Sequence, residues 1–171
     1  MGRECGVRFG RLICMSKHAG SQPAAGEAQV RVRYAETDQM GVVYHANYLV
    51  WFEVGRVELM RQRGLDYKRL EIDEGCWIAV VEATVRYKAP ARYDDELIVE
   101  TRVRSVRGPV IRFSYKIVRA EDRLLLCEGE TVHVVIGRDM KRRRIPKKYA
   151  EILGAGASHA SSEISAGDGK Q

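Results

Sequence analysis

The chain has 171 residues, of which 45% are hydrophobic and 30% are charged, a mixture typical of one globular domain that folds without disulfide staples. Its net charge of +6 and pI of about 9.2 favour an anionic partner, which could be nucleic acid, an acidic membrane face or a phosphorylated cofactor. No apolar run approaches the roughly 20 residues of a membrane-spanning helix, and none near the start is long enough for a secretory signal.

The cysteines indicate the compartment and argue against a zinc site. Cys5, Cys14, Cys76 and Cys127 are far apart and form no C-x-x-C pair, and none of the four histidines completes a ligand pattern with them. Cys127 lies in L-L-L-C-E-G-E, where a small buried hydrophobic residue is expected. This pattern predicts a cytoplasmic protein that binds no metal.

The two ends of the chain are small and polar in composition. We expect residues 1–27 to be a flexible leader, in which either Met1 or Met15 could be the start of translation, and residues 153–171 to be a disordered tail. A compact domain is therefore predicted for residues 28–152.

The first predicted strand covers residues 29–34, because Val30, Val32 and Tyr34 alternate there with basic residues. Tyr34 also opens the stretch Y-A-E-T-D-Q-M-G-V-V-Y-H-A-N-Y. That stretch puts an acid, a glycine turn and a histidine directly ahead of a strongly apolar segment. Backbone N–H groups at a helix start have no partner inside the helix, so a junction of this kind can bind a substrate oxygen.

A helix is predicted from about Ala46–Asn47 to Arg63, with Gly64 at the expected C-terminal position. Its best apolar stripe is formed by Tyr48, Phe52, Gly55 and Leu59, but Val50, Trp51, Val54, Val57 and Met60 spread apolar groups almost all round. We therefore expect the helix to be buried. Two acid–base pairs are spaced to meet across one turn, namely Glu53–Arg56 and Glu58–Arg61.

A short helix or loop over residues 65–75 is followed by four alternating segments, which predict strands over residues 77–88, 96–106, 110–118 and 123–137. On the first of these, one face should carry Trp77, Ala79, Val81, Ala83, Val85 and Tyr87. One strand, one long helix and four further strands predict an α+β fold, in which the helix covers the apolar face of an antiparallel sheet.

At this point the sequence resembles a known family. The run Y-x-x-x-D-x-x-G-x-V-Y-H-x-x-Y, followed by the helix and by R-Y-K-A-P-A-R-Y-D-D-E-L, is similar to the hotdog-fold acyl-CoA thioesterases. The branch it resembles contains 4-hydroxybenzoyl-CoA thioesterase and the Tol–Pal-associated thioesterases. The resemblance covers about residues 30–149. It implies a long helix wrapped by a curled antiparallel sheet of about five strands, with active sites at the interface of a homodimer that can pair into a homotetramer.

By this resemblance Asp38 is the catalytic carboxylate, acting either as the base that activates water or as a nucleophile that forms a mixed anhydride. An aspartate here could also simply stabilise a turn. The His45 N–H is expected to hold the oxyanion, and Gly41 to let the chain turn closely. The side chains of His45 and Tyr34 are expected to support the site, although a structural role remains open for both.

CoA carries phosphates, so basic residues are expected at the mouth of the pocket. The 4-hydroxybenzoyl branch binds these phosphates with an Arg-Arg-Lys run that corresponds here to R-G-P, in which only Arg107 remains. Lys88 and Arg92 are the other candidates. The basic run Lys141–Arg144 is expected to be a solvated segment. Glu53 lies on the helix, where another hotdog branch has its base, and is interpreted as structural.

The leading hypothesis is an acyl-CoA thioesterase with no metal or redox cofactor. One alternative is a narrower aromatic-CoA hydrolase that acts on 4-hydroxybenzoyl-CoA or 1,4-dihydroxy-2-naphthoyl-CoA, and another is a non-catalytic acyl-CoA binding module. A nucleic-acid partner is poorly supported, because the basic residues are scattered over strands and are not gathered with exposed aromatic residues.

Overall fold

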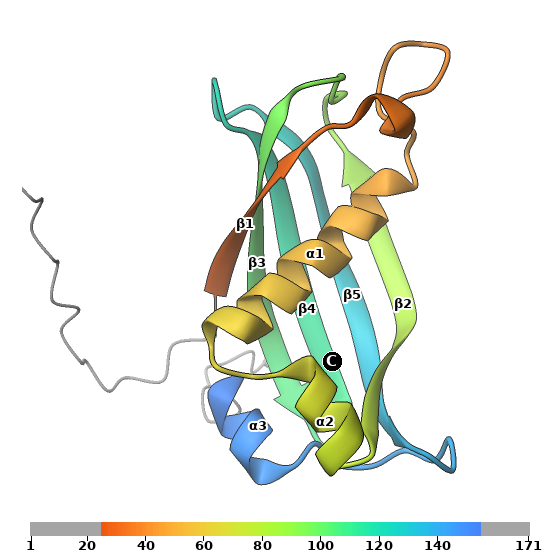
Figure 1. Cartoon of the computed structure of the whole chain (residues 1–171), viewed down its shortest axis with the longest axis vertical. Helices are drawn as coiled ribbons and strands as arrows, with labels where there is room; N and C mark the ends of the chain where they lie inside the picture. The colour runs from red at the N-terminus through yellow and green to blue at the C-terminus, as the bar shows by residue number, and fades with distance from the viewer. Residues whose placement is uncertain (1–24, 155–171) are drawn as a thin grey trace, which may run out of the picture.

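A five-stranded antiparallel sheet with one long helix across its face forms the architecture of residues 25–154, the part of the chain that the computed structural model describes (Figure 1). The strand order is β1-β3-β4-β5-β2, so β1 and β2 are the two edges. In chain order the elements are β1 (Ala25–Arg31), the 3-10 helix η1 (Tyr34–Glu36), α1 (Asn47–Gln62), α2 (Tyr67–Asp73), β2 (Cys76–Tyr87), β3 (Glu96–Arg107), β4 (Val110–Arg119), β5 (Leu125–Gly137) and α3 (Lys147–Ile152).

The predicted α+β class is confirmed, and the predicted helix and the last four strands agree with the structure to within two residues. The first strand is placed differently, because β1 begins at Ala25 and ends at Arg31. Tyr34 therefore does not end a strand but starts η1, where 78% of its surface is exposed. Residues 25–27 of the predicted leader belong to β1, and Leu153 of the predicted tail is only 1% exposed, whereas the rest of the leader, residues 1–24, and of the tail, from residue 155, lies outside the described residues.

Helix α1 packs against the sheet through the predicted stripe. Tyr48, Phe52 and Leu59 are each at most 3% exposed, and the Phe52 ring stacks on Tyr115 of β4 with 4.3 Å between ring centroids. Gly55 lies so close to β3 that a Cβ atom would meet side-chain atoms there. The absence of a side chain lets the helix backbone approach the strand.

The expectation that α1 is buried on all sides is wrong. Three of its valines form an exposed stripe at helical spacing, with exposures of 49%, 41% and 41% for Val50, Val54 and Val57. An apolar stripe on the outer face of a helix indicates a surface that packs against another chain more often than one that faces water. The spacing of apolar residues shows on which sides of a helix they lie, but it does not show what covers each side.

Strand β2 differs from its predicted pattern at a β-bulge, where the register shifts between Val80 and Glu82. Before the bulge Ile78 and Val80 face the helix side of the sheet, opposite Val135 and His133 of β5, whereas after it the odd-numbered residues do so. The predicted single face from Trp77 to Tyr87 is therefore correct only in its second half. An inserted residue reverses the alternation of a strand.

Cys127 is fully buried in β5, as predicted. Burial, followed by the neighbouring Glu128 carboxylate, raises the pKa of the Cys127 thiol to about 12. The thiolate form is therefore scarce at neutral pH, and Cys127 serves as a packing residue. None of the helices in residues 25–154 is long and apolar enough to cross a membrane.

Candidate active site

The loop between η1 and α1 turns sharply around Asp38. The Asp38 N–H donates to the Val42 carbonyl over 2.9 Å, and the Gly41 N–H donates back to the Asp38 carbonyl over 3.0 Å. The carboxylate of Asp38 accepts a hydrogen bond of 2.8 Å from the Met40 N–H. Gly41 has a φ of +71°, a left-handed conformation that glycine adopts without strain. Gly41 therefore lies in the turn with the conformation that glycine favours.

The C-terminal half of the loop is tied to the segment around the end of β2. The Val43 N–H donates to the Ala91 carbonyl over 2.9 Å, and the Tyr87 hydroxyl donates to the His45 carbonyl over 3.0 Å. The Tyr48 hydroxyl accepts from the Ala91 N–H over 3.0 Å. These bonds fix the start of α1 against the sheet, so the positions of Asp38 and His45 depend on elements far apart in the sequence.

The backbone at the start of α1 provides a free donor. Ala46 already has helical dihedral angles, and within residues 25–154 the His45 N–H has no hydrogen-bond acceptor. The His45 residue is exposed. The Asn47 side chain does not cap the helix but donates to the Glu36 carbonyl over 2.8 Å. The helix start therefore lacks a side-chain cap, and its N–H groups can donate to a substrate oxygen where a capping side chain would otherwise accept.

Glu36 is a residue of this region that sequence reasoning missed. Its side chain is buried, and it accepts hydrogen bonds from the Arg33 N–H, the Arg33 guanidinium and the Trp51 indole N–H. Its carbonyl also accepts from the Tyr44 N–H over 2.9 Å. Burial alone would raise the pKa of Glu36, but the Arg33 and Trp51 hydrogen bonds outweigh it and leave that pKa below its ordinary value. The signal in the sequence that could have indicated this ion pair is the three-residue spacing of Arg33 and Glu36.

We expect Glu36→Gln to destabilise the protein by about 1–2 kcal/mol, because it removes a charge-assisted hydrogen bond in a buried position. Since the folded pKa of Glu36 is lowered, its contribution is present above the unfolded pKa and is lost as the pH falls through the folded pKa. Urea unfolding at pH 7 and pH 4 should therefore show a larger difference between wild type and variant at pH 7.

A matched control is Glu58→Gln, which removes the partner of Arg61 at the same three-residue spacing on an exposed part of α1. A pair at the surface is screened by solvent and contributes little, so the control should change the free energy of unfolding much less than Glu36→Gln does. Equal losses in the two variants would show that Glu36 has no special role in holding the loop.

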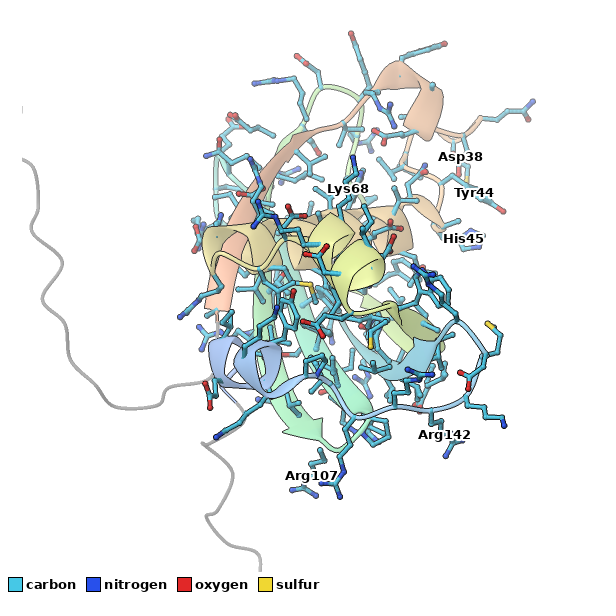
Figure 2. The ribbon with its side chains drawn as sticks, turned by 60° about the horizontal axis from the view of Figure 1, so that its bottom comes forward. Asp38, Tyr44, His45, Lys68, Arg107 and Arg142 are labelled. Carbon is cyan, nitrogen blue, oxygen red and sulfur yellow. The ribbon has the colours of Figure 1, made fainter. Side chains whose placement is uncertain are left out.

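Tyr34 and the His45 ring lie on the surface of this loop. The Tyr34 ring packs edge-on against Tyr93 with 5.7 Å between centroids, and the His45 ring lies 4.3 Å from that of Tyr44. Figure 2 shows Asp38, Tyr44 and His45 together on one side of the molecule. The structure thus brings the His45 ring and the Asp38 carboxylate to one surface, where both can face a substrate.

The three predicted CoA-binding residues are not brought together. Lys88 and Arg92 follow the end of β2, next to the Ala91 carbonyl that anchors the loop, and Lys88 forms an ion pair of 3.0 Å with Glu128. Arg107 lies at the other end of β3, a strand of twelve residues and therefore about 40 Å long. Arg107 and Arg142 both lie at the end of the molecule away from Asp38 (Figure 2).

The predicted ion pair between Glu53 and Arg56 is not formed, whereas that between Glu58 and Arg61 is confirmed. Arg56 is only 7% exposed and points toward His133 of β5, while Glu53 is exposed on the outer side of α1. The pairs have the same spacing, but only Glu58 and Arg61 both project outward. Glu53 therefore lacks the ion pair with Arg56 that supported its interpretation as a structural residue.

A hollow of about 470 Å³ lies over the middle strands, away from Asp38. It is polar and lined by charged side chains of both signs on neighbouring strands, including Arg86, Glu100, Arg102, Lys116, Glu128 and Glu130. Its walls are strands whose backbone groups are paired in the sheet, so it offers no free helix start. The residues for which the sequence predicts catalysis, Asp38 and His45, lie in the loop ahead of α1 and are not among those that line this hollow.

An antiparallel sheet of five strands around one long helix is the hotdog fold, and the solved structure of DHNA-CoA thioesterase from Staphylococcus aureus shares it. That structure is 31% identical and has a TM-score of 0.71, with 75% of this chain and 87% of that chain covered. The fold and this likeness define the class as hotdog-fold thioesterases, as the resemblance predicted.

Sequence comparison gives the family. Residues 32–153 match the model of the Thioesterase-like superfamily, and the chain belongs to this family. The acyl-CoA thioester hydrolase YbgC of Escherichia coli is 40% identical over 119 residues, which cover 69% of this chain and 87% of the relative. The acyl-CoA thioesterase YbgC of Haemophilus influenzae is 35% identical over 119 residues, which cover 70% and 87%.

Proposed function

We propose that the protein hydrolyses the thioester of acyl-CoA to a free acid and CoA. The observation that carries this proposal is the Asp38 carboxylate held in a turn ahead of a helix start whose His45 N–H has no acceptor among residues 25–154. The names of the relatives in Escherichia coli and Haemophilus influenzae support the same activity.

In the base route, Asp38 takes a proton from water as the water oxygen bonds to the thioester carbon. The carbonyl oxygen becomes an oxyanion, which the His45 N–H and the positive end of the helix dipole stabilise. The C–S bond then breaks, and the CoA thiolate takes up a proton. In the nucleophile route, Asp38 itself bonds to that carbon and displaces the thiolate, and water then hydrolyses the mixed anhydride.

A homodimer or homotetramer is part of the proposal. Strand β2 is an edge of the sheet, and Val80 and Val81 on it are 55% and 59% exposed. An uncovered edge with apolar side chains pairs readily with another strand. The exposed valine stripe of α1 also supports a second copy. We also place Arg107 in the CoA site of another protomer, since it lies about 40 Å from the Lys88 end of its own sheet.

The narrower alternative is hydrolysis of aromatic CoA thioesters. Its support is the likeness to DHNA-CoA thioesterase of Staphylococcus aureus. The basic residues Lys88 and Arg92, beside the anchored loop, are proposed to attract the phosphates of CoA in either case. A cytoplasmic location is also proposed, because Cys76 and Cys127 are both free thiols.

The activity is tested by thiol release from a panel of short-chain, long-chain and aromatic acyl-CoA thioesters, detected with 5,5′-dithiobis(2-nitrobenzoate). We expect release of CoA from at least one class, at a rate that depends on Asp38. A preference for aromatic thioesters would favour the narrower alternative. Tight binding of acyl-CoA without thiol release would contradict hydrolysis and favour a binding module.

A further inference from the structure

Arg56 is a buried cation without an anionic partner. It is 7% exposed, and within residues 25–154 no carboxylate lies within 4 Å of its guanidinium. Its Nη1 lies 3.3 Å from Nε2 of His133, and its Nε is enclosed without an acceptor in the described part of the chain. Arg56 thus differs from the paired arginines at the surface.

The side chains in hydrogen-bond contact with Arg56, and those bonded to them in turn, are polar but uncharged. His133 Nε2 lies 2.7 Å from the Thr131 hydroxyl, which lies 2.9 Å from the Tyr115 hydroxyl. His133 is fully buried, and within the described residues its Nδ1 has no partner. Burial, and then the charge of Arg56, lowers the pKa of His133 to about 3, so the imidazole is neutral at pH 7. None of these groups balances the guanidinium charge.

A buried charge without a counter-charge is costly, by several kcal/mol in real proteins. An apolar side chain would fill the same volume without this cost. The position of Arg56 is therefore suited to an anion that comes from outside the described chain, either a bound molecule or a second copy.

The location of Arg56 relates it to the proposed reaction. Eleven residues separate it from His45 along the chain, and α-helical rise makes this distance about 16 Å. Helical side chains lean toward the N-terminus, which brings the guanidinium to about 10 Å from the helix start. Two exposed apolar side chains lie on the elements alongside, Leu49 on α1 with 40% exposure and Val80 on β2, opposite His133, with 55% exposure. The exposed Glu53 lies between Leu49 and Arg56 on α1.

We propose that Arg56, with His133 beside it, binds a carboxylate at the far end of the acyl group. This inference rests on the proposed function and names its substrate class, the mono-CoA thioesters of dicarboxylic acids. An extended chain advances about 1.3 Å per carbon, so the separation fits acids of about six to eight carbons. The methylene groups would pack on Leu49 and Val80, and the terminal carboxylate would supply the missing charge.

The test compares octanoyl-CoA with suberyl-CoA, which has the same number of acyl carbons but a terminal carboxylate. We expect wild type to have a kcat/KM at least tenfold higher for suberyl-CoA. Arg56→Met should lower that value at least tenfold, because the neutral side chain cannot bind the carboxylate, while octanoyl-CoA is affected little. Arg56→Lys should restore part of the preference. The exposed Arg63→Met is the matched control and should leave the ratio unchanged.

Other outcomes overturn the inference. If wild type hydrolyses octanoyl-CoA but shows no preference for suberyl-CoA, or if Arg56→Met leaves the ratio unchanged, then the carboxylate assignment is wrong while the thioesterase proposal stands. If Arg56→Met changes the oligomeric state and not the ratio, the counter-charge belongs to a second copy.

A preference of wild type for 4-hydroxybenzoyl-CoA over both suberyl-CoA and octanoyl-CoA would assign the cluster of Arg56 and His133 to a phenol. Should Arg56→Met fail to fold, the inference is decided by the ratio of kcat/KM for suberyl-CoA to kcat/KM for octanoyl-CoA in Arg56→Lys, which should be lower than in wild type. If no thioester releases thiol, the proposed function itself fails.

Discussion

Replacement of Asp38 by asparagine is expected to lower kcat by about 10²–10⁴-fold and to leave the fold intact. Asparagine has the same shape and keeps an oxygen that can accept the 2.8 Å hydrogen bond from the Met40 N–H. The turn should therefore survive. What is lost is the ability to take a proton or to form a mixed anhydride, so the change falls on turnover. Thiol release under saturating acyl-CoA measures it, and circular dichroism and the thermal midpoint verify the fold.

Asp66→Asn is a suitable control for this variant. Asp66 caps the start of α2, where its carboxylate accepts from the N–H groups of Lys68 and Arg69. It resembles Asp38 in binding nearby backbone donors, but it belongs to another helix start. We expect unchanged kcat and a loss of stability below about 1 kcal/mol. Full activity in Asp38→Asn, or equal losses in both variants, would show that Asp38 is a turn residue.

A single turnover in H₂¹⁸O tests the nucleophile route. If Asp38 is a nucleophile and water attacks the Asp38 carbonyl of the mixed anhydride, ¹⁸O appears in the Asp38 peptide after one turnover. If Asp38 is a base, or if water attacks the acyl carbonyl of the anhydride, all of the label goes into the product acid, so only label in the peptide identifies a nucleophile. Mass spectrometry of the peptide and of the acid reads out both results from one sample.

The sequence predicts the elements better than it predicts their surroundings. The last four strands and α1 follow from the periods of apolar residues, which are local properties, so their bounds agree closely with the structure. The Asp38 turn was also predictable, because Gly41 marks it. The bulge in β2 reverses the faces of the strand and depends on pairing with β5, about 50 residues later in the chain. No local pattern reports such pairing.

The two acid–base pairs of α1 illustrate the same limit. Glu58 and Arg61 pair at the surface as their spacing predicts, but Arg56 turns toward His133 and leaves Glu53 exposed. Spacing gives the angle between two residues on a helix and not the angle of each to the sheet. That second angle is fixed by Phe52 and Gly55, which pack on β4 and β3. The buried guanidinium was therefore visible only in three dimensions.

The packing of α1 on the sheet leads to a prediction about Gly129. A Cβ atom at this position of β5 would overlap the Thr84 carbonyl oxygen of β2 and two atoms of the Phe52 ring. The carbonyl belongs to a paired strand and cannot move freely, and the ring is stacked between α1 and Tyr115. We expect Gly129→Ala to destabilise the protein by about 3 kcal/mol or more, because overpacking forces both elements apart.

Gly108→Ala separates this steric effect from backbone strain. Gly108 has a φ of +59°, but a Cβ atom there would meet nothing within 4 Å, so alanine should cost only about 1 kcal/mol. Urea unfolding of both variants measures the difference. Because Phe52 holds α1, and α1 presents the His45 N–H, Gly129→Ala should also lower kcat when it folds, whereas Gly108→Ala should not. Equal stabilities would mean that β5 and α1 shift apart at little cost, and the site would then not depend on this contact.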